Sequence, residues 1–206
     1  MTRPRPISTL VTGFGAFPGV QTNPTAAIVA RLRAEAPARL HAEVLPVSWA
    51  RGPQALAQAI DEATEAHGPL RLLLHLGVAT SADRLRIESN AAAHARRSVD
   101  VDGLHAAQLP PSGTVMFNPR ALVARLCDGG LPATLSDDAG GYLCNAIFGY
   151  GLRWAGDRGA IAAFLHVPMP GTARPDTSNR SWSEADLDIA VRIVLEALGA
   201  EAGEKA

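Results

Sequence analysis

Short apolar runs alternate with longer amphipathic stretches along most of the chain. A short apolar run bounded by Gly or Pro is typical of a buried strand, and an apolar period of three to four residues is typical of a helix that packs one face on a core. The apolar runs predict strands over 8–12, 42–47, 71–77, 132–136 and 160–167. The amphipathic stretches predict helices over 24–34, 53–67, 119–127, 141–154 and 183–198.

Two of these helices begin with the same signal. Asn23-Pro24 and Asn118-Pro119 each place an Asn where its side chain can accept a hydrogen bond from the first free amides. The Pro that follows suits the first helical position, which needs no amide hydrogen. At the far end of the chain, past the last apolar position of the last helix, we expect 199–206 to fray.

The section from Thr80 to Gly113 is less regular and rich in polar residues. We interpret it as a long loop region with one or two short antiparallel strands around 85–91. Strands that alternate with helices predict an α/β protein: a three-layer α/β/α sandwich around an open, mostly parallel, twisted sheet with a short antiparallel edge. Because no repeat or low-complexity linker interrupts the pattern, we expect one domain over 1–206.

Charge and cysteine content exclude several classes of function. The 206 residues carry 19 basic and 20 acidic side chains, so we expect neither a nucleic-acid nor a membrane partner. No apolar run is long enough for a membrane span, and no signal peptide follows Met1, so we expect a cytoplasmic protein with reduced thiols. Two cysteines exclude a disulfide framework and a four-thiolate zinc site, and no histidine pair has zinc-ligand spacing.

A glycine-rich turn follows the first predicted strand. Gly13 and Gly15 match the start of a dinucleotide-binding motif, but Pro18 stands where the third Gly belongs and offers no amide to a phosphate. The turn instead presents Phe14 and Phe17. Both rings could belong to the core, or they could wall an apolar pocket at the carboxyl ends of the strands, where open α/β sheets bind ligands.

Cys144 lies in or near the first turn of a predicted helix, after the Gly140-Gly141 loop. Free amides and the helix dipole at this position favour a thiolate and can bind an oxyanion. The alternative is a small buried hydrophobic side chain, which is the usual state of cysteine. Cys127 fits that alternative better because it comes late in its helix, so we expect it to pack in the core.

Two further residues could work with this thiol. His166 ends the last apolar run, at the edge of the sheet where α/β active sites form, although a satisfied core histidine is an equal alternative. Alternation puts Glu88 on the face of Arg84 and Arg86, where a surface salt bridge is its simplest role. His75 lies in mid-strand, and we assign it to the core. Together Cys144, His166 and Glu88 could supply a nucleophile, a base and a carboxylate that orients the base.

The same residues resemble the motifs of the pyroglutamyl peptidase family, the type I pyrrolidone-carboxylate peptidases. The family's T-G-F-x-x-F-x-G…N-P pattern is similar to residues 11–24, and its G…E segment is similar to Gly77 through Glu88. Its G-x-x-x-C-N…F and F-[IL]-H-V-P patterns are similar to 140–148 and 164–168. The order and coarse spacing hold over nearly the whole chain.

The resemblance implies a cysteine exopeptidase that releases amino-terminal pyroglutamate from peptides through a thioester, with no metal or organic cofactor. It implies Cys144 as nucleophile, His166 as general base and Glu88 as the residue that orients it. It also implies that Phe14 and Phe17 grip the pyrrolidone ring and that Asn23 helps to hold the pocket. The family includes tetramers and monomers, which leaves a homo-oligomer open.

The segment 80–103 departs from the family pattern. Thr80-Ser81-Ala82 stands where bacterial members commonly carry Gly-Gly-Arg, and Ala93 replaces a common Asn. Ser98 stands where an Arg is associated with the oxyanion site, with Arg96 and Arg97 beside it. The sequence therefore leaves two other hypotheses open: a related cysteine amide hydrolase with an altered acyl pocket, and a non-catalytic binding protein on the same fold.

Overall fold

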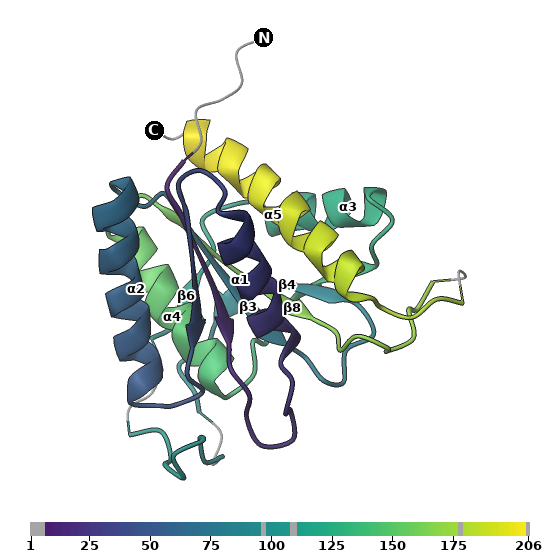
Figure 1. Ribbon diagram of the computed structural model, residues 1–206, viewed down its shortest axis with the longest axis horizontal. Coiled ribbons are helices and arrows are strands. Elements are labelled where there is room, and N and C mark those ends of the chain that lie inside the picture. Colours follow the sequence, from purple (N-terminus) through teal and green to yellow (C-terminus); the bar gives the residue numbers. More distant parts are fainter. Residues whose placement is uncertain (1–6, 96–97, 108–110, 177–178, 205–206) are drawn as a thin grey trace.

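The computed structural model describes residues 7–95, 98–107, 111–176 and 179–204. Helices and strands alternate through most of this range, as the hydrophobic pattern predicts (Figure 1). The strands are β1 (Thr9–Phe14), β2 (Leu40–Leu45), β3 (Leu72–Val78), β4 (Leu85–Glu88), β5 (Asn90–Ala91), β6 (Gly113–Thr114), β7 (Ala133–Ser136) and β8 (Ile161–Val167). The helices are α1 (Pro24–Glu35), α2 (Arg51–His67), α3 (Pro119–Asp128), α4 (Leu143–Gly156) and α5 (Glu184–Glu204).

Six strands form one sheet in the order β2-β1-β3-β8-β4-β7. The four strands from β2 to β8 are parallel to their neighbours, whereas β4 runs antiparallel to β8 and parallel to β7. The strands β5 and β6 form a separate antiparallel pair. The predicted fold class is therefore confirmed. The antiparallel edge of the large sheet consists of β4 and β7, which run opposite to the other four strands.

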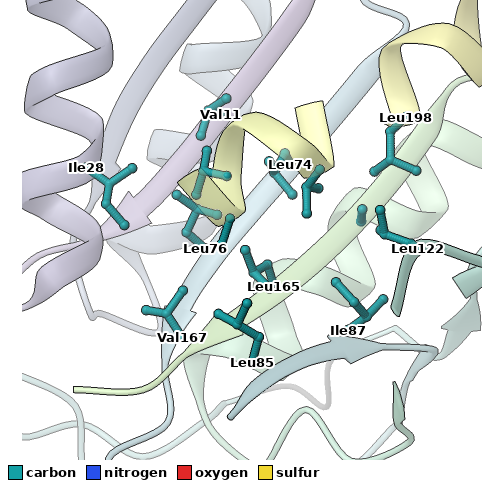
Figure 2. Close-up of a cluster of buried hydrophobic side chains, with 14 of the residues drawn as sticks. Val11, Ile28, Leu74, Leu76, Leu85, Ile87, Leu122, Leu165, Val167 and Leu198 are labelled. Carbon is teal, nitrogen blue, oxygen red and sulfur yellow. The ribbon is translucent and has the colours of Figure 1, made fainter. Parts of the chain in front are cut away.

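Helices cover both faces of the sheet, so the molecule has three layers (Figure 1). One buried cluster joins the sheet to α1, α3 and α5, and Figure 2 shows part of it, including Ile28, Leu122 and Leu198. A second cluster joins the opposite face to α2 and α4. No described helix combines the length and hydrophobicity that a bilayer crossing needs.

The two-residue period of each strand decides which side chains meet which helices. In β8, Leu165 and Val167 point into the cluster of Figure 2, so His166 between them faces the α4 side. In β4, Leu85 and Ile87 point into the same cluster, so Glu88 also faces the α4 side. The sheet thus brings the ends of two strands to the face on which α4 packs.

The helix starts form as the sequence predicts. The Asn23 side chain accepts a hydrogen bond from the Thr25 amide, and Asn118 accepts one from the Ala121 amide. The last helix is longer than expected. Because α5 continues to Glu204 with Ala202 buried against the core, the expected fraying is wrong over 199–204.

Candidate active site

Three side chains from distant parts of the sequence meet at the carboxyl end of β8. His166 is the sixth residue of this strand, Glu88 is the last residue of β4, and Cys144 is the second residue of α4. The antiparallel register between β4 and β8 pairs Arg86 with His166, which places Glu88 just beyond the histidine. The arrangement follows from strand pairing and from the packing of α4 on β8.

The Glu88 carboxylate is fully buried, and its Oε1 lies 2.8 Å from Nδ1 of His166. The interpretation of Glu88 as a surface residue is therefore wrong. Alternation gave the correct face for this side chain, but both faces of the sheet are covered by other parts of the chain. A carboxylate bonded to Nδ1 fixes the ring orientation and leaves Nε2 as the nitrogen that can serve the thiol.

His166 is buried and charged. Burial alone would lower its pKa, but side-chain hydrogen bonds with Cys144 and Glu88, together with the negative charges of these two groups, raise the pKa to about 9. At neutral pH His166 is therefore an imidazolium, with the Cys144 sulfur and the Glu88 carboxylate as its partners. The thiol itself is half-buried, so a ligand can reach it. This arrangement can supply a nucleophilic sulfur and a proton donor together.

The amino end of α4 leaves backbone amides free of a side-chain cap. Tyr142 occupies the N-cap position without a capping hydrogen bond, and Gly140 before it has a φ of 80°, which suits Gly. Exposed amides and the helix dipole at this end are favourable for an anion. Because Cys144 lies in this first turn, an oxyanion formed at a carbon bonded to its sulfur would be close to these amides.

A small apolar pocket of about 30 Å³ lies on one side of Cys144. Phe14 and Phe17 line it, as does Asn23, so the three residues expected at a substrate pocket do lie together. Phe14 is also buried in the core, which means that both interpretations of its ring hold. Asn23 uses its polar atoms within the loop, where it accepts from Thr25 and donates to the Gly15 carbonyl.

A larger cavity of about 780 Å³ lies against the same thiol. Cys144 and His166 line it, together with Phe17, Arg86 and Ser98. Tyr142 borders both spaces and donates a hydrogen bond from its hydroxyl to the Val99 carbonyl, 2.9 Å away. Sequence reasoning gave no role to Tyr142 or Arg86, although the position of Arg86 two residues before Glu88 already put both on one face.

The remaining residues that the sequence singled out lie apart from this site. His75 is a core residue as expected, with Nδ1 2.7 Å from the Thr12 hydroxyl and a pKa lowered to about 3 by burial. The expectation that Cys127 packs in the core is wrong, because its side chain is exposed. The buried stripe of α3 runs through Leu122 and Leu126, and the next residue turns away from it. Arg96 and Arg97 lie outside the described residues.

One group of side chains within the described ranges has the geometry to hold a metal ion. His41, Glu43 and Glu62 place ligand atoms within 4.8 Å of one another. These residues lie on β2 and α2, at the opposite side of the sheet from β4. Glu43 is already paired with Arg33, which competes for its carboxylate.

The α/β/α fold, with a thiol at a helix start beside a buried, charged histidine, defines the class of protein: a hydrolase of the cysteine peptidase type. More particularly, the chain belongs to the pyroglutamyl peptidase family, whose sequence profile matches residues 7–201. It is 31% identical to the pyrrolidone-carboxylate peptidase of Chromobacterium violaceum over 91% of this chain and 90% of that protein. It is also 31% identical to that of Gloeobacter violaceus, over 93% and 97%.

A solved structure gives the same result. The pyrrolidone carboxyl peptidase of Fervidobacterium islandicum superposes with a TM-score of 0.78 at 27% identity and covers 93% of this chain and 98% of that one. The family resemblance read from the sequence is therefore confirmed.

Proposed function

We propose that this protein is a cysteine exopeptidase that removes pyroglutamate from the amino terminus of peptides. The observation that carries the proposal is the convergence of Cys144, His166 and Glu88, with His166 hydrogen-bonded to Glu88, between an apolar pocket and a larger cavity. Membership of the pyroglutamyl peptidase family supports the substrate class. The reaction needs no metal or organic cofactor. A reduced thiol is required, which fits the cytoplasmic location that we propose.

The apolar lining of the small pocket suits the pyrrolidone ring because the lactam is flat and carries no charged amino group. Phe14 and Phe17 supply apolar contact area for the ring, and the side chain of Asn23 holds the loop that carries them. An ordinary amino terminus is charged at neutral pH and would lose its hydration in such a pocket without gaining a partner. We therefore assign selection for the lactam to these three residues.

The chemistry begins with the proton on His166. The Cys144 sulfur attacks the pyroglutamyl carbonyl carbon, and as the carbon–sulfur bond forms, the carbonyl electrons move to oxygen. The first amides of α4 stabilise this oxyanion. The carbon–nitrogen bond then breaks, and His166 gives its proton to the leaving amine. Water loses a proton to His166, attacks the thioester and releases pyroglutamate, which restores the sulfur and the charged imidazole.

Hydrolysis of pyroglutamyl-aminomethylcoumarin under reducing conditions tests this proposal. We expect turnover by the purified protein and its loss in Cys144→Ala, with Cys127→Ala as the matched control because that thiol is exposed and distant from the pocket linings. Absence of turnover by the unaltered protein would refute the proposal.

A second hypothesis, a cysteine amide hydrolase with an altered acyl pocket, is favoured by one observation. Ser98 lines the large cavity, where the family resemblance implies an arginine. This hypothesis expects iodoacetamide to label Cys144 at neutral pH, with poor release of pyroglutamate and better release of another acyl group. A non-catalytic binding protein would instead show Cys144 reacting no faster than Cys127.

A further inference from the structure

Arg86 lies beside the catalytic trio but is not part of it. Its backbone pairs with His166 across the antiparallel β4–β8 ladder, and its side chain lines the large cavity with His166 and Cys144. The charges that act on the histidine come from Cys144 and Glu88, and Arg86 is not among them. Arg86 is therefore part of the cavity wall beside the reacting residues.

No carboxylate among the described residues is paired with the Arg86 guanidinium. Within the described part of the chain, its side chain makes no salt bridge, whereas Arg84, just before the strand, binds both oxygens of Asp83. The Asp83 carboxylate feels the charge of Arg86, but Arg84 already holds it. A half-buried guanidinium that faces a cavity and lacks a partner can bind a carboxylate strongly, because its planar fork matches the two carboxylate oxygens.

The position of Cys144 decides which part of a substrate Arg86 meets. The thiol borders both the small apolar pocket and the large cavity. If the pyrrolidone ring occupies the pocket with Phe14 and Phe17, the amine that leaves the carbonyl carbon extends into the large cavity. Arg86 lines only that cavity, so its charge acts on the leaving group and not on the ring.

We propose that Arg86 recognises a carboxylate on the leaving-group side, so that the preferred substrates are pyroglutamyl peptides with a negative charge close to the scissile bond. This proposal rests on the proposed function. Two sources supply such a charge: an acidic side chain on the residue after pyroglutamate, and the terminal carboxylate of a dipeptide. Both offer the same group to the guanidinium, the glutamate carboxylate on a longer stem than the terminal one.

One carboxylate of the cavity wall opposes this preference. Asp138 also lines the large cavity, is exposed, and accepts a hydrogen bond from the Gly140 amide. Its exposed charge is screened by water and salt more than the half-buried charge of Arg86. The charge of Arg86 therefore outweighs that of Asp138, which favours a leaving amine that carries a carboxylate. If the charge of Asp138 outweighed that of Arg86, a leaving amine with a positive charge would be favoured.

The test compares four substrates of the full-length protein: pyroglutamyl-alanine amide, pyroglutamyl-glutamate amide, pyroglutamyl-lysine amide and pyroglutamyl-alanine with its free carboxylate. Product release is followed by chromatography, and kcat/KM is measured at one pH and low salt. We expect the two anionic substrates to exceed the neutral amide by roughly fivefold, a modest effect because the site is open to solvent. The glutamate amide and the free dipeptide separate the two sources of charge.

Variants assign the preference to a residue. Arg86→Gln is expected to bring the acidic-to-neutral ratio of kcat/KM to about one, and Arg86→Lys is expected to keep most of it. The control is Arg120→Gln, which removes an exposed charge from α3, outside the cavity lining, and should leave the ratio unchanged. Thermal unfolding of each variant shows that the fold is intact.

The outcomes separate two failures. If the unaltered protein cleaves none of the four substrates, the proposed function fails and the role of Arg86 falls with it. If it cleaves the neutral amide but shows no acidic preference, or if Arg86→Gln lowers all four rates equally, only the role of Arg86 is refuted. A preference for the lysine amide that disappears in Asp138→Asn would also refute it.

Discussion

Two buried histidines on neighbouring strands of the same sheet have opposite charge states. His75 on β3 and His166 on β8 both contact the ring of Phe164, and both are shielded from water. Burial lowers the pKa of His75 to about 3, whereas hydrogen bonds and charge from Cys144 and Glu88 overcome burial and raise that of His166 to about 9. Burial alone does not make a histidine catalytic; its partners determine the charge.

The partners differ because the histidines lie at different heights in the sheet. His75 is in mid-strand, where the neighbouring strand β1 offers only the Thr12 hydroxyl to Nδ1. His166 is one residue from the end of its strand, where the Glu88 side chain of the antiparallel strand β4 reaches it and α4 begins beside it. The carboxyl edge of the sheet is thus the place where side chains of several elements converge, as in other open α/β proteins.

The largest expected effect comes from replacing each histidine in turn. His166→Asn should lower kcat/KM for pyroglutamyl-aminomethylcoumarin by roughly 1000-fold, because the site loses its proton donor and acceptor. His75→Gln should retain activity in the folded protein, since His75 lines neither pocket. Steady-state kinetics with thermal melting checks both. Equal losses in two well-folded variants would refute the distinction between the two sites.

Glu88→Gln should have the next largest effect, roughly 100-fold on kcat/KM. The raised pKa of His166 means that its proton is lost as the pH rises through about 9, so the rate of the unaltered protein should fall above that pH. Without the carboxylate, this alkaline limb should move toward lower pH, because one of the two groups that stabilise the imidazolium is gone. A pH profile of kcat/KM checks this, and a limb that stays near 9 in Glu88→Gln would contradict it.

Two glycines that touch the histidines offer a matched pair of smaller effects. A Cβ at Gly77 would lie 2.7 Å from the Phe164 ring and 2.9 Å from His166, and a Cβ at Gly151 would lie 2.3 Å from His75. Each Gly→Ala change should lower the free energy of unfolding by about 1–3 kcal/mol through overpacking. Only Gly77→Ala should also lower kcat, because it displaces the ring that serves Cys144. Chemical denaturation and kinetics together check this pair, and a loss of kcat confined to Gly151→Ala would reverse the assignment.

The last comparison of the two histidines concerns stability at acid pH. The folded pKa of His75 lies below its ordinary value of 6.5, so its stabilising effect is complete above pH 6.5 and is lost as the pH falls toward 3, by at most about 1.4 kcal/mol per pH unit. The sign is opposite for His166, whose stabilising effect is complete below 6.5 and is lost as the pH rises toward 9. His75→Gln should flatten the acid slope between pH 6.5 and 5, measured by urea unfolding. An unchanged slope would show that His75 is not neutral in the folded state.

Much of the fold could be predicted from the sequence because local signals agree with it. The Asn-Pro helix starts form as expected, and the continuous apolar run of 160–167 becomes the buried strand β8. The length of α5 could not be predicted, because the burial of Ala202 depends on packing that no local pattern encodes. The same limit explains Cys127, whose exposure depends on which stripe of α3 meets the core.

The site was predictable only in part. Glu88 and His166 are 78 positions apart, and no spacing rule brings them together. The family resemblance implied both residues, and the register of β4 against β8 explains how they meet. Alternation placed Glu88 on the correct face but could not reveal that this face is covered. The position of Arg86 at the site could not be predicted for a related reason, because Arg86 belongs to no motif and only the folded chain shows the cavity that it lines.

The protonation states of the two histidines can be observed together in a long-range ¹H–¹⁵N correlation spectrum of the reduced protein, assigned with His166→Asn and His75→Gln. Between pH 6 and 10 we expect His166 to show two protonated ring nitrogens that titrate near pH 9, while His75 shows the pattern of a neutral ring throughout. A neutral His166 at pH 7 would contradict the charged trio on which the proposed mechanism depends.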